Sequence, residues 1–173
     1  MREVVIERAT ASDIDAILAL AEANDEAQGG ELSVHLDPQA MLRTMQEIPS
    51  VVARKGGRVV GFLLAWEKST FGVGRVQAML KAYAGGENAY VYGPIAVDAA
   101  LRGLGIAAAM FDELKRLVPG REGILFIKSD NEISLRAHRK MGMRQVAEFQ
   151  HAGTHLLVFS YRARSTRDAT DSN

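Results

Sequence analysis

The chain has 173 residues, 47% of them hydrophobic, and its 21 Lys and Arg balance 21 Asp and Glu. A chain of this length can bury roughly 70% of its unfolded surface, which is enough for a hydrophobic core without a metal or disulfide scaffold. Zero net charge argues against a broad basic face for nucleic acid, and the absence of Cys excludes disulfides, thiolate zinc sites and a cysteine nucleophile.

The N-terminal residues 1–8 carry two Arg and two Glu and lack the apolar core of a secretory signal. Every apolar stretch of the chain is far shorter than the roughly 20 residues that a membrane span requires. We therefore expect a cytoplasmic protein with neither a membrane nor a nucleic-acid partner.

Apolar periodicity predicts the elements of one domain. In chain order they are a strand at 4–6, helices at 10–21 and 37–48, strands at 51–54, 59–66 and 89–97, a helix at 103–118, a strand at 123–128, a helix at 131–141 and strands at 144–149 and 155–161. Residues 67–86 fit no regular pattern beyond a helical stretch at 76–83, and residues 162–173 are too polar to order themselves. The sequence thus predicts one domain over residues 1–161 and a polar tail at 162–173.

Local signals support these boundaries. Asp37-Pro38 is a typical helix start, because Asp caps the first turn and Pro tolerates its first position. Gly56-Gly57 has the composition of a two-residue hairpin turn, so the strands beside it should pair antiparallel. In the helix at 103–118 we expect one apolar stripe, made of Leu104, Ala107, Ala108, Phe111, Leu114 and Val118.

The strand, helix and strand between residues 89 and 128 predict a parallel pair, since a crossover helix returns the chain in the same direction. Pro94 lies inside the first of these strands and lacks a backbone donor. Gly93-Pro94 therefore predicts either a bulge, with local separation from the neighbouring strand, or a plain kink between two short strand pieces.

The turn at residues 98–107 is rich in small residues and begins a helix. Unpaired backbone N–H groups and the positive end of the helix dipole can receive a phosphate there, and Gly103, Gly105 and Ala107 let the backbone approach it. Taken alone, this spacing is equally consistent with tight strand–helix packing. A dinucleotide fold would place G-x-G-x-x-G after its first strand, and a P-loop would end in Lys-Ser or Lys-Thr, so neither of those patterns fits.

Two motifs in order extend this signal. Residues 95–107 read Ile-Ala-Val-Asp, then two Ala, then Leu-Arg-Gly-Leu-Gly-Ile-Ala; further on, Asn131 begins Asn-Glu-Ile-Ser and Lys140 begins Lys-Met-Gly-Met. Together they resemble the GNAT superfamily of acyl-CoA-dependent N-acetyltransferases, with its Arg/Gln-x-x-Gly-x-Gly/Ala pyrophosphate loop and its closing helix. The order of elements over residues 1–161 is also similar. The resemblance implies an α/β fold of GNAT type, with a central, mostly antiparallel sheet, one splayed parallel pair and helices on both faces.

The resemblance also implies acetyl-CoA as the co-substrate, bound between the splayed strands. Backbone groups near Ile95 and Val97 would hold the pantetheine arm and the acyl carbonyl, and amides of residues 103–107 would hold the diphosphate, with a charge-assisted contact from Arg102. The expected cofactor-binding residues are Ile95, Ala96, Val97, Arg102, Gly103, Leu104, Gly105, Ile106, Ala107, Asn131 and Ser134.

His138 departs from the family pattern, because a Tyr commonly stands at this position of the closing helix and protonates the leaving CoA thiolate. By their spacing, Asn131, Ser134 and His138 line one helical face. An imidazole can donate a proton, so His138 is the expected acid, with a partly exposed surface histidine as the alternative.

Amine acetylation also needs a base, because an alkylamine is almost fully protonated at neutral pH. Tyr92 and Glu87 are the candidates near the acyl end, with Tyr90 on the same strand face as Tyr92. The alternatives are core packing for the tyrosines and a solvated turn for Glu87.

The expected acceptor is a small-molecule or peptide primary amine that attacks acetyl-CoA directly in a ternary complex. Residues 22–37 carry five acidic side chains and no Lys or Arg, which favours a cationic amine, although an exposed helix face and a helix cap explain part of this set. Ser134 as a covalent nucleophile would need His138 as its base. We expect no metal, since His151 and His155 flank a hairpin turn. A homodimer is compatible with the resemblance.

Two other classes of function compete with this assignment. One is a non-catalytic acyl-CoA-binding or sensing module, which the substitution of the usual Tyr favours. The other is a dinucleotide-binding oxidoreductase, which the turn at 98–107 matches less well.

Overall fold

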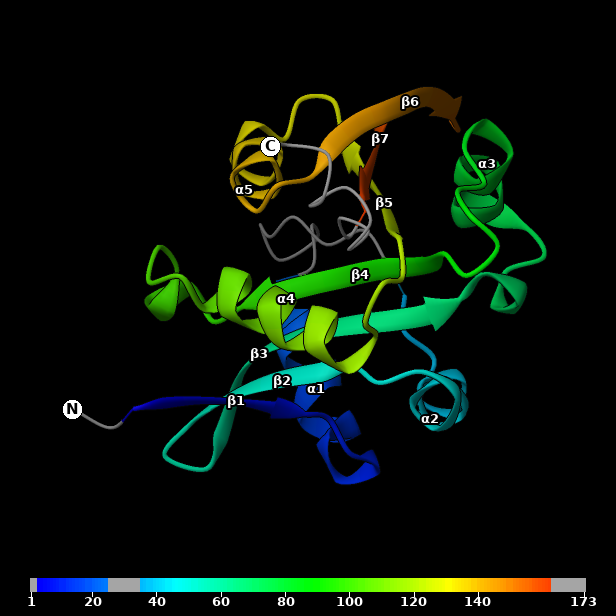
Figure 1. The fold of residues 1–173 in the computed structure, drawn as a ribbon. Coiled ribbons are helices and arrows are strands. Elements are labelled where there is room, and N and C mark those ends of the chain that lie inside the picture. Colours follow the sequence, from blue (N-terminus) through cyan, green and yellow to red (C-terminus); the bar gives the residue numbers. More distant parts are fainter. Residues whose placement is uncertain (1–2, 25–34, 163–173) are drawn as a thin grey trace, which may run out of the picture. The chain divides into compact units, whose positions relative to one another are not determined.

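The computed structural model describes residues 3–24 and 35–162. The chain divides into two compact units. Unit 1 comprises Met1–Trp66 and Gly93–Val118, and unit 2 comprises Glu67–Tyr92 and Pro119–Asn173. Figure 1 labels the elements of both.

The described strands form a mixed, mostly antiparallel sheet. They are β1 (Val4–Arg8), β2 (Val51–Lys55), β3 (Arg58–Glu67), β4 (Tyr90–Val97), β5 (Gly123–Lys128), β6 (Arg144–His151) and β7 (Thr154–Tyr161). Their hydrogen-bonding order is β1-β2-β3-β4-β5-β7-β6. β4 pairs with β5 in parallel at Tyr90 and Val91, whereas β1–β2, β2–β3, β5–β7 and β6–β7 pair antiparallel. This confirms the predicted fold class and its parallel pair.

The helices lie close to the predicted ranges. They are α1 (Ile14–Ala23), α2 (Pro38–Glu47), α3 (Gly74–Ala82), α4 (Ile106–Leu117) and α5 (Glu132–Lys140). α3 lies in the middle of the segment at 67–86, close to the helical stretch predicted at 76–83. In the residues that the structure describes, no helix has the length and hydropathy to cross a bilayer.

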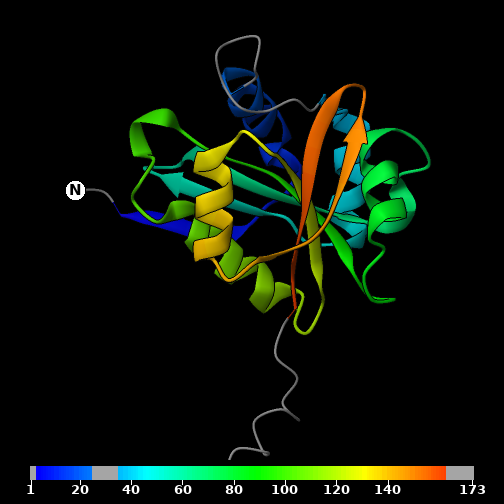
Figure 2. The same ribbon diagram turned by 90° about the horizontal axis from the view of Figure 1, so that it is seen from above.

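Unit 1 is a layer of strands covered by helices on both sides. Figure 2 shows α1 and α2 on one side of these strands and α4 on the other. Ile17 of α1, Met41 of α2 and Met110 of α4 are fully buried. β3 is buried at every position from Val59 to Trp66, because both of its faces are covered. Its sequence is accordingly a continuous apolar run.

Two Asp side chains and a pair of glycines determine the start of α2, the turn before α1 and the hairpin of unit 1. Asp37 accepts a hydrogen bond from the Ala40 backbone N–H at 2.9 Å and so caps α2. Asp13, in the short turn before α1, accepts from the Thr10 backbone N–H at 2.8 Å. Gly56 and Gly57 have φ angles of 60° and 83°, the left-handed pair that a type I′ hairpin turn requires. The predicted hairpin is confirmed.

Unit 2 carries α5 on one side of β5, β7 and β6 and α3 on the other (Figures 1 and 2). Its core contains Leu135 of α5, Met79 of α3 and Phe159 of β7, each at most 2% exposed. Gly142 follows α5 with φ 88°, which agrees with the predicted end of this helix at residue 141.

A buried carboxylate organises one end of unit 2. Glu122 is 5% exposed. It accepts hydrogen bonds from the Tyr83 hydroxyl at 2.6 Å, from Ser160 Oγ at 2.5 Å and from the Gly86 backbone N–H at 2.9 Å. Arg162 Nε lies 3.4 Å from its second oxygen. One side chain thus fastens the end of α3 and the approach to β4 onto β7.

The predicted helix at 103–118 needs one correction. α4 begins at Ile106, because Gly103 and Gly105 have φ angles of 77° and 78° and cannot continue a right-handed helix. Leu104 therefore lies in the turn and is 68% exposed. The buried stripe of the helix is Ile106, Met110, Phe111, Leu114 and Val118, and the predicted members Leu104 and Ala108 are exposed.

Candidate active site

The glycine turn of unit 1 presents open backbone at the start of α4. Among the described residues, a Cβ added at Gly103 or at Gly105 would meet no heavy atom within 4 Å. Gly105, the residue before the helix, has no side chain with which to cap α4. The first N–H groups of α4 therefore face a surface that side chains leave open. Such a helix start fits an anionic diphosphate, which needs backbone donors and room to approach them.

Arg102, the basic residue of the turn, is held by neighbouring groups of unit 1. Its Nη2 donates to the side-chain oxygen of Asn24 at the end of α1, and its Nε donates to the Val97 carbonyl at 3.3 Å. Asn24 is buried, and its amide nitrogen donates to the Leu20 carbonyl at 2.7 Å. Arg102 thus braces the turn against α1, and its positive charge stays at the turn.

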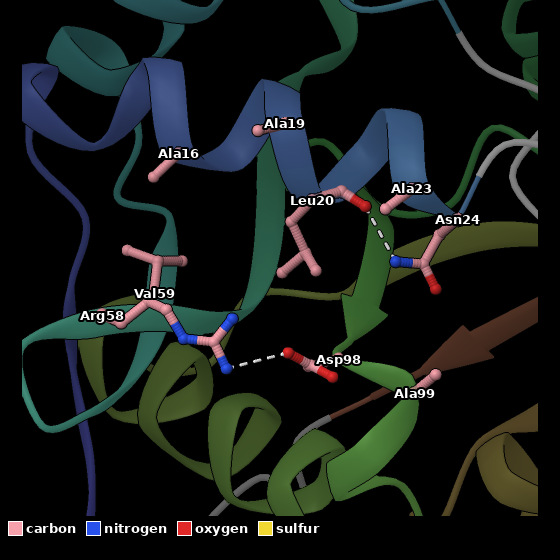
Figure 3. A pocket seen from close by; sticks show the side chains of 9 residues that line it. All are labelled: Ala16, Ala19, Leu20, Ala23, Asn24, Arg58, Val59, Asp98 and Ala99. Carbon is pink, nitrogen blue, oxygen red and sulfur yellow. Dashed lines mark hydrogen bonds and ion pairs between the residues drawn. The ribbon is translucent and has the colours of Figure 1, made fainter.

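An open groove of about 380 Å³ lies beside this brace in unit 1 (Figure 3). Its lining residues are Ala16, Ala19, Leu20, Ala23, Asn24, Arg58, Val59, Asp98 and Ala99. The guanidinium of Arg58 is paired with Asp98 across it, at 3.0 Å. Because this cation already has a carboxylate, the mainly apolar groove suits a diphosphate less well than the glycine turn does.

The part of β4 expected to hold the acyl arm shows a local departure from regular strand. Gly93 has φ 104°, outside the extended region, and its carbonyl accepts a hydrogen bond from Trp66 Nε1 at 2.7 Å. Ile95 is half-buried, and Ala96 and Val97 are buried. The segment is thereby fixed to β3 at the point where Pro94 removes a donor.

In unit 2, the polar face of α5 is confirmed as a set of side chains in mutual contact. Asn131 caps the helix, accepting from the Ser134 backbone N–H at 3.1 Å. Ser134 in turn contacts the His138 ring, whose Nδ1 lies 2.8 Å from the Ser134 carbonyl and 3.2 Å from its Oγ. The three residues keep one another in place.

The position of His138 fixes its protonation. A carbonyl oxygen only accepts hydrogen bonds, so the proton of the neutral ring lies on Nδ1 and points at the Ser134 carbonyl. Burial lowers the pKa of His138 below 6.5, and the Ser134 carbonyl, which raises it, does not compensate. The ring is therefore neutral at pH 7, with a bare lone pair on Nε2.

The two base candidates have opposite environments. Tyr92 is 4% exposed, and burial raises its pKa well above 10, so its hydroxyl keeps its proton at neutral pH. Its ring meets that of His138 edge to face, with centroids 5.6 Å apart. Glu87 is exposed in the turn before β4. Tyr90 is buried in the core of unit 2.

Several sequence expectations concern other positions. Asp25, Glu26 and Glu31 of the acidic segment lie outside the described residues, while Glu22 is exposed and Asp37 is the cap of α2. His155 Nε2 lies 2.6 Å from the Glu148 carboxylate. In the described part of the chain, no three His, Asp or Glu side chains gather as a metal site.

Sequence reasoning missed the side chains that brace these segments. Asn24, Trp66 and Glu122 each bond a residue at least 27 positions away, and their nearest sequence neighbours give no sign of it. Trp66 bonds the backbone carbonyl of Gly93, and Asn24 bonds Arg102 of the glycine turn. Only the folded chain brings such groups together.

Comparison with known proteins agrees with this architecture. The acetyltransferase (GNAT) family matches residues 6–143. Ard1 from Thermoplasma volcanium superposes with a TM-score of 0.69 at 17% identity, covering 94% of this chain and 99% of its own. An N-acetyltransferase from Staphylococcus aureus Mu50 gives 0.66 at 22% identity, over 92% and 98%. yncA from Salmonella typhimurium, solved with its cofactor acetyl-CoA, gives 0.70 at 16% identity, over 94% and 95%.

A comparison with curated protein sequences finds no match. The match to the family nevertheless spans most of the chain, from β1 to the end of α5, and includes both motifs. The chain belongs to the GNAT family of acetyltransferases.

Proposed function

We propose that the protein transfers an acetyl group from acetyl-CoA to a primary amine by direct attack in a ternary complex. The observation that carries the proposal is the open glycine turn at the start of α4, in a chain of the GNAT family. Acetyl-CoA supplies the activated acyl group, and its binding by the similar yncA supports this choice. The cytoplasmic location, the amine acceptor and the absence of a metal stay predictions.

Backbone amides would do most of the binding. The N–H groups of residues 103–107 would hold the diphosphate, because they lie at the positive end of the α4 dipole with no Cβ in the way at Gly103 and Gly105. Arg102 adds positive charge while remaining braced on Asn24. Ile95, Ala96 and Val97 would offer backbone groups to the acyl arm, next to the irregular Gly93. Asn131 and Ser134 would act by holding α5 and His138 in position.

The geometry of α5 supports direct attack over an acyl-enzyme. A serine nucleophile needs a neighbouring base to take its proton. The nitrogen that faces Ser134 is Nδ1, which carries a proton of its own and directs it at the Ser134 carbonyl. The Ser134 hydroxyl therefore lacks activation by His138, and the chain contains no Cys to take its place.

A non-catalytic acyl-CoA-binding module is the alternative, and it rests on His138 at the family's usual Tyr position. Release of free CoA thiol, measured with acetyl-CoA and a panel of primary amines, separates the two. Turnover that depends on the amine supports the transferase, whereas calorimetric binding of CoA without thiol release supports the module.

A matched pair of variants tests the diphosphate site. Leu104 is 68% exposed in the turn, so Leu104→Asp adds a carboxylate and Leu104→Asn adds a neutral side chain of the same shape. A carboxylate roughly 6–8 Å from two phosphate charges costs about 1–2 kcal/mol in a partly screened site. We expect the Kd for CoA to rise roughly 5- to 30-fold more in Leu104→Asp than in Leu104→Asn, with a smaller ratio at high salt. Equal Kd values in the two variants would show that the diphosphate binds elsewhere.

A further inference from the structure

His138 Nε2 is a buried hydrogen-bond acceptor that no donor of residues 3–24 and 35–162 reaches. The side chain is 4% exposed. Within the described residues, Nε2 has no hydrogen-bond partner, whereas Nδ1 is satisfied by the carbonyl and hydroxyl of Ser134. Buried polar atoms are nearly always paired, because leaving one unpaired costs the full desolvation of the group. An acceptor kept in this state is available for a donor that arrives with a ligand.

The contact with Ser134 determines which nitrogen reacts. Since Nδ1–H is committed to the Ser134 carbonyl at 2.8 Å, the ring cannot move its proton to Nε2 without losing that hydrogen bond. Nε2 therefore starts every cycle unprotonated. An unprotonated Nε2 can accept a proton at once, but it can donate one only after it has been protonated.

The surroundings of the ring keep it neutral. The ring facing it from β4 is Tyr92, which holds its own proton. On α5 itself the nearest cation in sequence is Arg139, whose guanidinium lies 5.7 Å from the centre of the Phe159 ring of β7. The pKa of His138 is lowered by burial and raised by the Ser134 carbonyl, with no charged side chain of the described residues among its causes.

Resting on the proposed acetyl transfer, we infer that His138 acts first as the proton acceptor of the reaction, through the bare Nε2. A neutral amine attacks the acetyl carbonyl carbon, a C–N bond forms, and the nitrogen loses one proton to Nε2. The C–S bond then breaks, and the imidazolium returns the same proton to the thiolate sulfur. The products are the amide and CoA thiol, and His138 is neutral again. One residue thus performs both proton transfers, in an order that the Ser134 contact sets.

The sign of the pH dependence distinguishes this order from a resting acid. A base that must be neutral gives a kcat that rises with pH through the His138 pKa, below 6.5, and then levels off. A resting acid gives a kcat that falls as pH rises through the same value. We expect the rising limb in the wild type and its loss in His138→Gln, which can accept a hydrogen bond but not a proton. In that variant kcat should fall about 100-fold or more, whereas His155→Gln should behave as the wild type.

Nitrogen NMR of the uncomplexed protein tests the inference without any turnover. Long-range 15N–1H correlations distinguish the two tautomers, and the signal absent from His138→Gln assigns His138 among the four His of the chain. We expect protonated Nδ1 and bare Nε2 near pH 7. A proton on Nε2, a falling limb, or full activity in a folded His138→Gln would overturn the inference. An absence of amine-dependent thiol release at every pH, with the expected tautomer, would instead count against the proposed function.

Discussion

Replacing Glu122 by Gln should destabilise the protein strongly, because one buried carboxylate serves three donors. It accepts from the Tyr83 hydroxyl, Ser160 Oγ and the Gly86 backbone N–H, at 2.6, 2.5 and 2.9 Å. In Glu122→Gln the amide oxygen can still accept from Tyr83 and Ser160, but as a neutral group. The amide nitrogen would face the Gly86 N–H, donor against donor.

The expected cost follows from these contacts. Exchanging two charge-assisted hydrogen bonds for neutral ones costs about 1 kcal/mol each, and an unsatisfied buried N–H costs about 1–3 kcal/mol more. We therefore expect Glu122→Gln to lower the free energy of unfolding by about 3–5 kcal/mol. Ser160→Ala removes a single donor and should cost about 1 kcal/mol. Glu113→Gln, which weakens a surface ion pair with Arg116, is the matched control and should cost about 0.5 kcal/mol or less.

Urea denaturation at pH 7 measures these differences, provided that the denaturant slope is unchanged. A second readout is their pH dependence. Burial alone would raise the pKa of Glu122, but Ser160, Tyr83 and the Gly86 N–H outweigh it and hold the pKa below 4.5. The stabilisation by ionised Glu122 is therefore complete above pH 4.5 and is lost as pH falls through its lower pKa in the folded state. The difference in the free energy of unfolding between the wild type and Glu122→Gln should narrow over that pH range. A variant within 0.5 kcal/mol of the wild type at pH 7 would refute this account of the cluster.

Two further predictions concern stability. Asp13 is buried and accepts hydrogen bonds from the Thr10 backbone N–H and from Arg54 Nη2, the latter at 2.5 Å, and these contacts outweigh its burial and hold its pKa below 3.8. Asp13→Asn should therefore lower the free energy of unfolding, measured in urea, by about 1–3 kcal/mol at pH 7 and by progressively less below pH 3.8. Asp15→Asn, on the exposed face of α1, should stay within about 0.5 kcal/mol of the wild type, and equal costs for the two variants would contradict the prediction. At Gly85, with φ 67°, an added Cβ would lie 2.6 Å from Ile124 Cδ1 and 2.9 Å from Glu122 Oε2. Gly85→Ala should therefore lower the thermal unfolding temperature clearly more than Gly120→Ala, whose φ of 74° carries the same backbone strain of about 1–2 kcal/mol without a described neighbour within 4 Å. Similar unfolding temperatures for the two variants would mean that the surroundings of Gly85 relax.

The sequence was sufficient for the elements and the main motifs. Periodicity located the strands and helices to within a few residues, since the pleat and the helical turn repeat over short distances. Asp37 and Gly56-Gly57 gave correct boundaries because a cap or a tight turn depends on the residues beside it. The glycine turn and the closing helix were enough to indicate the family, which the match over residues 6–143 bears out.

Local patterns failed where backbone conformation broke the repeat. Leu104 fits the apolar stripe of α4 by spacing, yet the left-handed Gly103 and Gly105 place it outside the helix and in solvent. Glycine permits that conformation but does not require it, so the sequence gives no reason to choose it.

The tertiary structure decided the burial, the protonation and the hydrogen-bond partners of the side chains in these motifs. The sequence by itself placed Ser134 and His138 on one helix face, but only the folded chain shows the imidazole buried against Tyr92. There the Ser134 carbonyl holds the proton on Nδ1, and Nε2 has no hydrogen-bond partner among the described residues. The folded chain likewise directs Arg102 to Asn24, 78 residues away. Burial and long-range hydrogen bonds determine where a proton resides, and these depend on chain segments that the local sequence cannot identify as neighbours.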